Sequence, residues 1–343
     1  MKTVHVLVAG PLVALMLVGM SGAFAASDFT EFALTTDGHW PQALTIGSDG
    51  NLWATEVLKH ELLRITPAGE ITEFPVSGKD VGVLQGIAGG ADGNIWFTSR
   101  EENSIRRMSL KGEFNGEFKL PSSVPGKIGM DGPWPREIIS GPDNNLWFTE
   151  MAANKIARIT MKGEITEFAV PTANAKPYCL VIGPDKNLWF SEWNAAKIGQ
   201  ITVDGKITEF PAKSPGREIA CGADGNLWIT SDKANAIGRI SPNGEAVEFP
   251  IPTAASQPLG ITAGSDGNVY FCEFKAGKIG RITPDGKITE FEIPTPKSEP
   301  FCLLSGPDGN IWIALQANRI ARLAIPGAKA MANSPVKQGS VAK

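Results

Sequence analysis

Short runs of alternating hydrophobic and polar residues follow one another along most of the chain. One stretch shows the pattern well, with runs rich in β-branched and aromatic residues at 136–140 (REIIS), 146–150 (LWFTE), 155–160 (KIARIT) and 164–170 (EITEFAV). This composition predicts β-strands. The Gly, Pro, Asn and Asp residues between the runs predict tight turns. The stretch therefore predicts a four-stranded antiparallel sheet of about 40 residues, which cannot bury both of its faces alone.

The same unit recurs seven times. An aromatic residue marks its second strand at Trp53, Trp96, Trp147, Trp189, Trp228, Tyr270 and Trp312. A Gly-x-Asp turn precedes it at 47–51, 90–94, 141–145, 183–187, 222–226, 264–268 and 306–310. A spacing of about 40 residues is that of a propeller blade. We therefore predict an all-β fold, a seven-bladed β-propeller of four-stranded antiparallel blades in one domain, 26–327, with each aromatic wedged between neighbouring blades.

The two ends of the repeat region complement each other. The segment DFTEFAL (28–34) copies the outer strand of the other units, such as ITEFPV (71–76). The last unit begins near Pro300 and stops at Pro326 without such a strand. We expect the N-terminal strand to complete the last blade, because this pairing removes an open sheet edge.

The segments before and after the repeats resemble a signal peptide and a disordered C-terminal tail. Residues 1–25 have a basic start at Lys2, an apolar run over 4–20 and small residues in Ala23-Phe24-Ala25. This pattern predicts a signal peptide, and so a periplasmic or secreted protein without a membrane span in the mature chain. Residues 328–343 are expected to form a disordered tail. A net charge of −4 without a basic cluster argues against nucleic-acid binding, and we expect a monomer.

Four cysteines lie within strand patterns, at Cys179, Cys221, Cys272 and Cys302. They lack the spacing of a metal site. A Cys272–Cys302 disulfide between adjacent blades is one interpretation, and buried free thiols are the one we favour.

The functional site is expected where the innermost strands begin, at the mouth of the central channel. The residue after the proline-like position of each unit is Gln42, Gln85, Arg136, Tyr178, Arg217, Leu259 and Phe301, and the residue before it is Trp40, Val83, Trp134, Lys176, Pro215, Gln257 and Glu299. This ring varies although the sequence around it repeats, as a binding face does.

Aromatic and basic residues dominate this ring. Trp40, Trp134 and Trp193 lie outside the blade-wedging position, close to Arg136, Lys176 and Arg217 in the repeat. Such a set suits a planar or anionic small molecule. Alternatively, Arg136 and Arg217 pair with the adjacent Glu137 and Glu218 in a purely structural ring. The predicted ligand-binding residues are Trp40, Gln42, Gln85, Trp134, Arg136, Lys176, Tyr178, Arg217 and Glu299.

Several elements recur almost verbatim, among them GPDGN, LWFTE, KIGRIT and ITEFPIPT-like segments. Together they resemble the virginiamycin B lyase (streptogramin lyase) family over residues 28–326. The resemblance implies a seven-bladed propeller that linearises cyclic depsipeptide antibiotics by elimination. It also implies Mg²⁺, a histidine base and carboxylates at the channel mouth.

The catalytic pattern of that family is not kept in this chain. The resemblance implies histidines at positions 259 and 301 and a glutamate at 316, where this sequence has Leu259, Phe301 and Gln316. Only Glu299 matches, and it is the one candidate metal ligand. Leucine and phenylalanine cannot accept a proton, so we expect the elimination chemistry to be absent.

The sequence is compatible with three functions. The first is a lyase-family propeller whose own chemistry is altered or lost. The second is a periplasmic binding or interaction module using the Arg/Trp-lined mouth. The third is a metal-dependent hydrolase similar to gluconolactonases, with a metal held by carboxylates such as Glu299, Glu150, Glu192 and Glu273.

Overall fold

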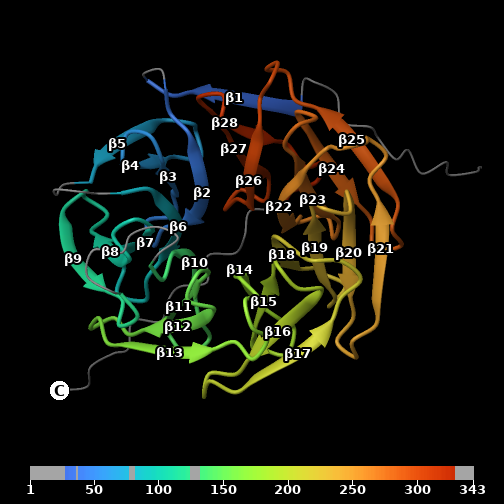
Figure 1. Cartoon of the computed structure of the whole chain (residues 1–343). Coiled ribbons are helices and arrows are strands. Elements are labelled where there is room, and N and C mark those ends of the chain that lie inside the picture. Colours follow the sequence, from blue (N-terminus) through green and yellow to red (C-terminus); the bar gives the residue numbers. More distant parts are fainter. Residues whose placement is uncertain (1–27, 36–37, 77–81, 124–131, 329–343) are drawn as a thin grey trace, which may run out of the picture.

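A computed structural model describes residues 28–35, 38–76, 82–123 and 132–328. These residues form seven four-stranded sheets arranged in a ring around a central channel (Figure 1). The prediction of an all-β, seven-bladed propeller is therefore confirmed. The predicted signal peptide, and the predicted tail from residue 329 on, lie outside the described residues. Within the described part, no helix is long and apolar enough to cross a membrane.

Each blade runs from its inner strand at the channel to its outer strand at the circumference. Blades 1 and 2 contain β2 (Pro41–Ile46), β3 (Leu52–Glu56), β4 (Glu61–Ile65), β5 (Ile71–Pro75), β6 (Leu84–Gly89), β7 (Ile95–Ser99), β8 (Ser104–Met108) and β9 (Phe114–Lys119). Blades 3 and 4 contain β10 (Pro135–Ser140), β11 (Leu146–Glu150), β12 (Lys155–Ile159), β13 (Ile165–Ala169), β14 (Pro177–Ile182), β15 (Leu188–Glu192), β16 (Lys197–Ile201) and β17 (Ile207–Pro211). Blades 5 and 6 contain β18 (Ile219–Cys221), β19 (Leu227–Ser231), β20 (Ala236–Ile240), β21 (Ala246–Pro250), β22 (Pro258–Ala263), β23 (Val269–Glu273), β24 (Lys278–Ile282) and β25 (Ile288–Glu292). Blade 7 contains β26 (Pro300–Ser305), β27 (Ile311–Leu315), β28 (Arg319–Leu323) and β1 (Phe29–Ala33).

The N-terminal strand closes the ring, as predicted. β1 pairs antiparallel with β28, from Phe29 opposite Leu323 to Ala33 opposite Arg319. Phe32 stacks on Trp312 with ring centroids 5.5 Å apart, which joins β1 to the core of the last blade. The pairing covers the edge that β28 would otherwise present to solvent.

The repeated turn and the repeated aromatic form one structural unit. In blade 1 the indole Nε1 of Trp53 donates a hydrogen bond to Asp49 Oδ1 at 3.2 Å, and Asn51 Nδ2 donates to Asp49 Oδ2 at 2.9 Å. Gly47 is required beside them, because a Cβ there would lie 2.7 Å from Trp53 Nε1. The ring is fully buried, stacks on Phe74 of the outer strand and packs with core residues of blade 2. The tryptophan therefore wedges between neighbouring blades, as predicted.

Candidate functional site

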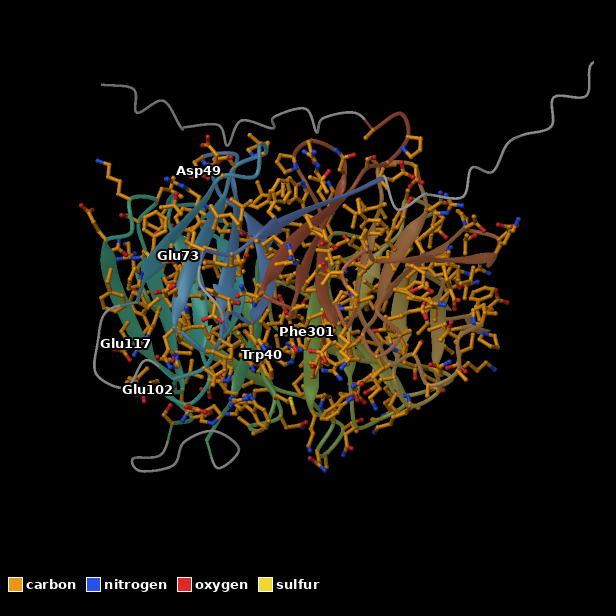
Figure 2. All side chains as sticks on the ribbon, turned by 90° about the horizontal axis from the view of Figure 1, so that it is seen from above. Trp40, Asp49, Glu73, Glu102, Glu117 and Phe301 are labelled. Carbon is orange, nitrogen blue, oxygen red and sulfur yellow. The ribbon has the colours of Figure 1, made fainter. Side chains whose placement is uncertain are left out.

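The seven inner strands all begin on one face of the ring. Figure 2 places Trp40 and Phe301 toward this face and Asp49 on the opposite one. In six inner strands the register with the second strand shifts just after the first residue. Such a bulge redirects the side chain that follows it. In blades 1–4 and in blade 7, the residue after the proline-like position lines the mouth of the channel, whereas Leu259 of blade 6 packs in the core.

Two cavities lie along the axis. The channel itself has a volume of about 510 Å³ and is lined by residues from all seven inner strands. A separate cavity of about 230 Å³ at its mouth is lined by Gln42, Gln85, Trp134, Arg136, Met151, Tyr178, Trp193, Arg217 and Phe301. The structure thus brings six of the nine predicted ligand-binding residues together, along with Trp193.

The other three predicted residues do not line this cavity. Trp40, Lys176 and Glu299 precede the inner-strand proline, where the backbone carbonyl is tied to the end of the second strand. For example, Glu299 accepts a hydrogen bond from the backbone N–H of Gln316 at 3.1 Å. Trp40 is 44% exposed. None of these three side chains lines the mouth cavity, whereas Trp134, at the equivalent position of blade 3, does.

Two arginines enclose Tyr178 at the mouth. The Cζ of Arg136 lies 3.4 Å from the centroid of the Tyr178 ring, and the Cζ of Arg217 lies 5.1 Å from it. Arg136 and Tyr178 are both buried. Trp193 packs on Tyr178 with ring centroids 5.6 Å apart. The cluster concentrates positive charge on a rigid aromatic platform.

Each arginine already contacts one carboxylate. Arg136 Nη2 lies 3.2 Å from Glu218 Oε1, and Arg217 Nη1 lies 3.4 Å from Asp232 Oδ2. Of the two glutamates named in the structural-ring alternative, Glu218 does pair with an arginine, but with Arg136 of another blade, and Arg217 pairs with Asp232. Adjacent residues of a strand point to opposite sides, so each guanidinium meets a carboxylate of another strand or loop.

Three N–H groups around the mouth have no hydrogen-bond partner among the described residues. They are the Nε1 groups of Trp134 and Trp193 and the Nε of Arg217. All three atoms are buried, and all three side chains line the mouth cavity. Buried donors are normally paired, so these atoms are suited to bind acceptor atoms of a ligand.

A second ring of side chains lies one residue deeper in the channel. It contains Glu137, Cys179 and Glu218, whose ligating atoms lie within 4.8 Å of one another. Burial, and then the Glu218 carboxylate, raise the pKa of Glu137 to about 8. Burial likewise raises the pKa of Cys179, which keeps its thiol protonated. Sequence reasoning missed this cluster because it treated the two glutamates only as arginine partners.

The positions where the resemblance implies catalytic histidines are filled by packed apolar side chains. Leu259 is 2% exposed within the core between blades 6 and 7. Phe301 stacks edge-on against Phe274 with centroids 6.2 Å apart. Only Glu299 and the amide of Gln316 offer oxygen atoms at the matching positions. Mg²⁺ needs near-octahedral oxygen coordination, so these residues do not fit the implied ion.

The carboxylates named for the hydrolase alternative do not converge. Glu150, Glu192 and Glu273 end the second strands of three different blades and are buried there. Among the described residues, the clusters of ligating side chains include neither these three nor Glu299. All four cysteines are free thiols, and Cys179 and Cys272 are buried, as we favoured.

Comparison with known proteins agrees with the fold and the motifs. The model of the virginiamycin B lyase family matches residues 21–133 and 127–339. A virginiamycin B lyase from Staphylococcus aureus is 35% identical, with a TM-score of 0.78 over 87% of this chain and 99% of that one. A streptogramin B lyase structure is 34% identical, with a TM-score of 0.78 over 86% and 97% of the two chains. A catalytically inactive histidine-to-alanine variant of the Staphylococcus aureus enzyme, with quinupristin, is 35% identical, with a TM-score of 0.79 over 87% and 99%.

Proposed function

Because the chain belongs to the virginiamycin B lyase family, we propose that it is a binding propeller of that family, exported from the cytoplasm, whose channel mouth holds a small planar anion. In this proposal the elimination chemistry of the family is lost. One observation carries the proposal. The buried N–H groups of Trp134, Trp193 and Arg217 around the mouth cavity have no hydrogen-bond partner among the described residues.

The chemistry of the lining supports an anion. A carboxylate or phosphate accepts hydrogen bonds from indole and guanidinium N–H groups. The rings of Trp134, Trp193 and Tyr178 offer faces on which a planar group can stack. A volume of about 230 Å³ suits a small molecule in preference to a cyclic peptide.

The loss of lyase chemistry is inferred from the residues that replace the implied base. General-base catalysis needs a group that can take a proton near neutral pH. Leu259 and Phe301 have no such group, and the sequence contains no histidine after His60. The inactive histidine variant of the Staphylococcus aureus enzyme supports the view that this chemistry depends on a histidine. Export is inferred from the signal-like segment 1–25.

Titration with benzoate and with inorganic phosphate tests the binding. We expect one site per chain by calorimetry, with weaker binding at high salt because the attraction is partly electrostatic. Substituting Arg136→Gln together with Arg217→Gln should weaken binding by about 100-fold or more, since hydrogen bonds to charged groups contribute about 1.5–3 kcal/mol each.

Two further variants keep this test decisive. Trp193→Phe keeps an aromatic ring and removes one N–H donor, so it should weaken binding in a folded protein even if the double arginine variant is unstable. Arg158→Gln is the matched control, because Arg158 contacts Asp143 and the Val203 carbonyl outside the mouth cavity. Equal binding in the parent, the Trp193→Phe variant and the double variant would refute the proposal, as would no binding of either anion.

A further inference from the structure

Several blades contain a repeated ion pair whose glutamate also accepts a hydrogen bond from the preceding blade. The third strands of blades 3, 4, 6 and 7 begin with a cation that faces the central glutamate of the outer strand. The pairs, with their N–O distances where they exceed 2.5 Å, are Lys155–Glu167, Lys197–Glu209 (2.9 Å), Lys278–Glu290 (3.5 Å) and Arg319–Glu31 (3.8 Å). The same glutamates accept hydrogen bonds from Ser122, Thr172, Thr253 and Thr295 of the preceding blade.

Blade 1 departs from this arrangement. Its third strand begins with Glu61, so a carboxylate stands where the other blades have Lys, Arg or an uncharged residue. The outer-strand partner is again a glutamate, Glu73, which accepts a hydrogen bond from Thr35 after β1. Blade 1 thus has two carboxylates where blades 3, 4, 6 and 7 have one carboxylate and one cationic side chain.

A histidine completes the cluster. His39 occupies the position taken by Ala175, Ser256 and Ser298 before later inner strands, and its side chain is fully buried. Its Nε2 lies 3.6 Å from Glu73 Oε1, and the ligating atoms of His39, Glu61 and Glu73 all lie within 4.8 Å of one another. The site lies beneath the outer strand β5, which Figure 1 shows at the circumference.

Glu61 itself points to a missing cation. Its Oε2 is buried and has no hydrogen-bond partner among the described residues. A buried carboxylate oxygen without a partner costs free energy unless a donor or a cation satisfies it.

We propose that blade 1 binds a divalent transition metal of the Zn²⁺ class through His39, Glu61 and Glu73, in place of the lysine that the repeat supplies elsewhere. Zn²⁺ accepts both imidazole nitrogen and carboxylate oxygen as ligands, whereas Mg²⁺ and Ca²⁺ favour oxygen ligands alone. The site is independent of the anion site at the mouth.

The metal would stabilise the closure of the ring. The backbone N–H of His39 donates to Asn318 Oδ1 of blade 7 at 2.9 Å, and Glu73 contacts Thr35 directly after β1. A metal bound to His39 and Glu73 therefore links blade 1 to both segments that complete blade 7. We expect its role to be structural, because none of the three ligands lines the mouth cavity.

Zinc binding to untagged, metal-stripped protein tests the proposal. Calorimetry should show one equivalent of Zn²⁺, and saturating Zn²⁺ should raise the melting temperature by about 3 °C or more, while Mg²⁺ raises it less. Glu61→Lys restores the residue of the other blades and should abolish the zinc-dependent shift while the metal-free protein stays at least as stable. His39→Ser, the residue before blades 6 and 7, should weaken zinc binding at least tenfold.

Cys179→Ser is the control for the channel cluster of Glu137, Cys179 and Glu218, and it should leave the zinc-dependent shift unchanged. A zinc-dependent rise in melting temperature that persists in both Glu61→Lys and His39→Ser would overturn the proposal. So would a shift lost only in Cys179→Ser, which would assign the metal to the channel, or the absence of zinc binding by the parent protein.

Discussion

At the scale of single residues, the seven blades differ most at one equivalent position near the start of each inner strand. In six blades the residue after the proline-like position lines the mouth, and there Arg136, Tyr178 and Arg217 form a charged aromatic cluster. In blades 6 and 7 the equivalent residues are apolar: Leu259 is buried in the core, and Phe301 packs on Phe274 at the edge of the mouth.

We expect no ring opening of streptogramin B antibiotics by this protein. A general base typically contributes about 100- to 10,000-fold in rate, and the positions of the implied base hold Leu259 and Phe301. The purified protein is incubated with the antibiotic and Mg²⁺, and ring opening is followed by mass spectrometry against a Staphylococcus aureus virginiamycin B lyase as positive control. Metal-dependent turnover by the purified protein would contradict the prediction.

At the scale of strands, the ends of β11, β15 and β23 bury acidic side chains. Burial, and then the carboxylates of Glu167, Glu209 and Glu290, raise the pKa of Glu150 to about 8 and those of Glu192 and Glu273 to about 7. The folded state therefore holds protons on these groups at pH values where the unfolded chain has released them. Their contribution to stability is complete below about pH 4.5 and is lost as the pH rises through 7–8.

The free energy of unfolding should accordingly fall between pH 5 and pH 8.5. Each such group contributes at most about 1.4 kcal/mol per pH unit within its window. Glu150→Gln should flatten part of this dependence, because glutamine stays neutral at every pH. Denaturant unfolding at several pH values measures the effect, with the exposed Glu164→Gln as control. An identical slope in Glu150→Gln and the parent would show that Glu150 does not retain its proton.

At the scale of the whole molecule, stability depends on closure of the ring. β1 brings Phe29, Phe32 and Leu34 into contact with the last and first blades, where Phe29 and Leu34 are buried. Without this strand, β28 would become an open edge, and the core shared by blades 7 and 1 would lose Leu34 and Phe32.

Deleting residues 28–34 should lower the melting temperature by about 10 °C or more. Burial of Phe29, Phe32 and Leu34 contributes about 2 kcal/mol each to the free energy of unfolding. Losing these contributions lowers the melting temperature of a chain of this size by about the stated amount. Thr30→Ala, at an exposed position of the same strand, should change it little. Differential scanning calorimetry gives both values, and a deletion variant that melts with the parent would show that closure contributes nothing.

The sequence determined the fold because every signal for it is local and repeated. The turn that holds Trp53, the alternation of each strand and the complementary ends of the chain act within one unit or between neighbours, so seven copies define a closed ring. For the same reason, aligning the repeats was enough to locate Gln42, Gln85, Trp134, Arg136, Tyr178 and Arg217 at one mouth.

Only the tertiary structure decided which side chains meet. Trp134 lines the mouth cavity, whereas Trp40, Lys176 and Glu299 at the equivalent positions of other blades do not. Arg136 meets Glu218 from two blades further along the chain, and His39 meets Glu61 and Glu73 beneath an outer strand. Such contacts depend on blade curvature and ring closure, which bring residues distant in the chain within a few ångströms and leave no local sequence pattern.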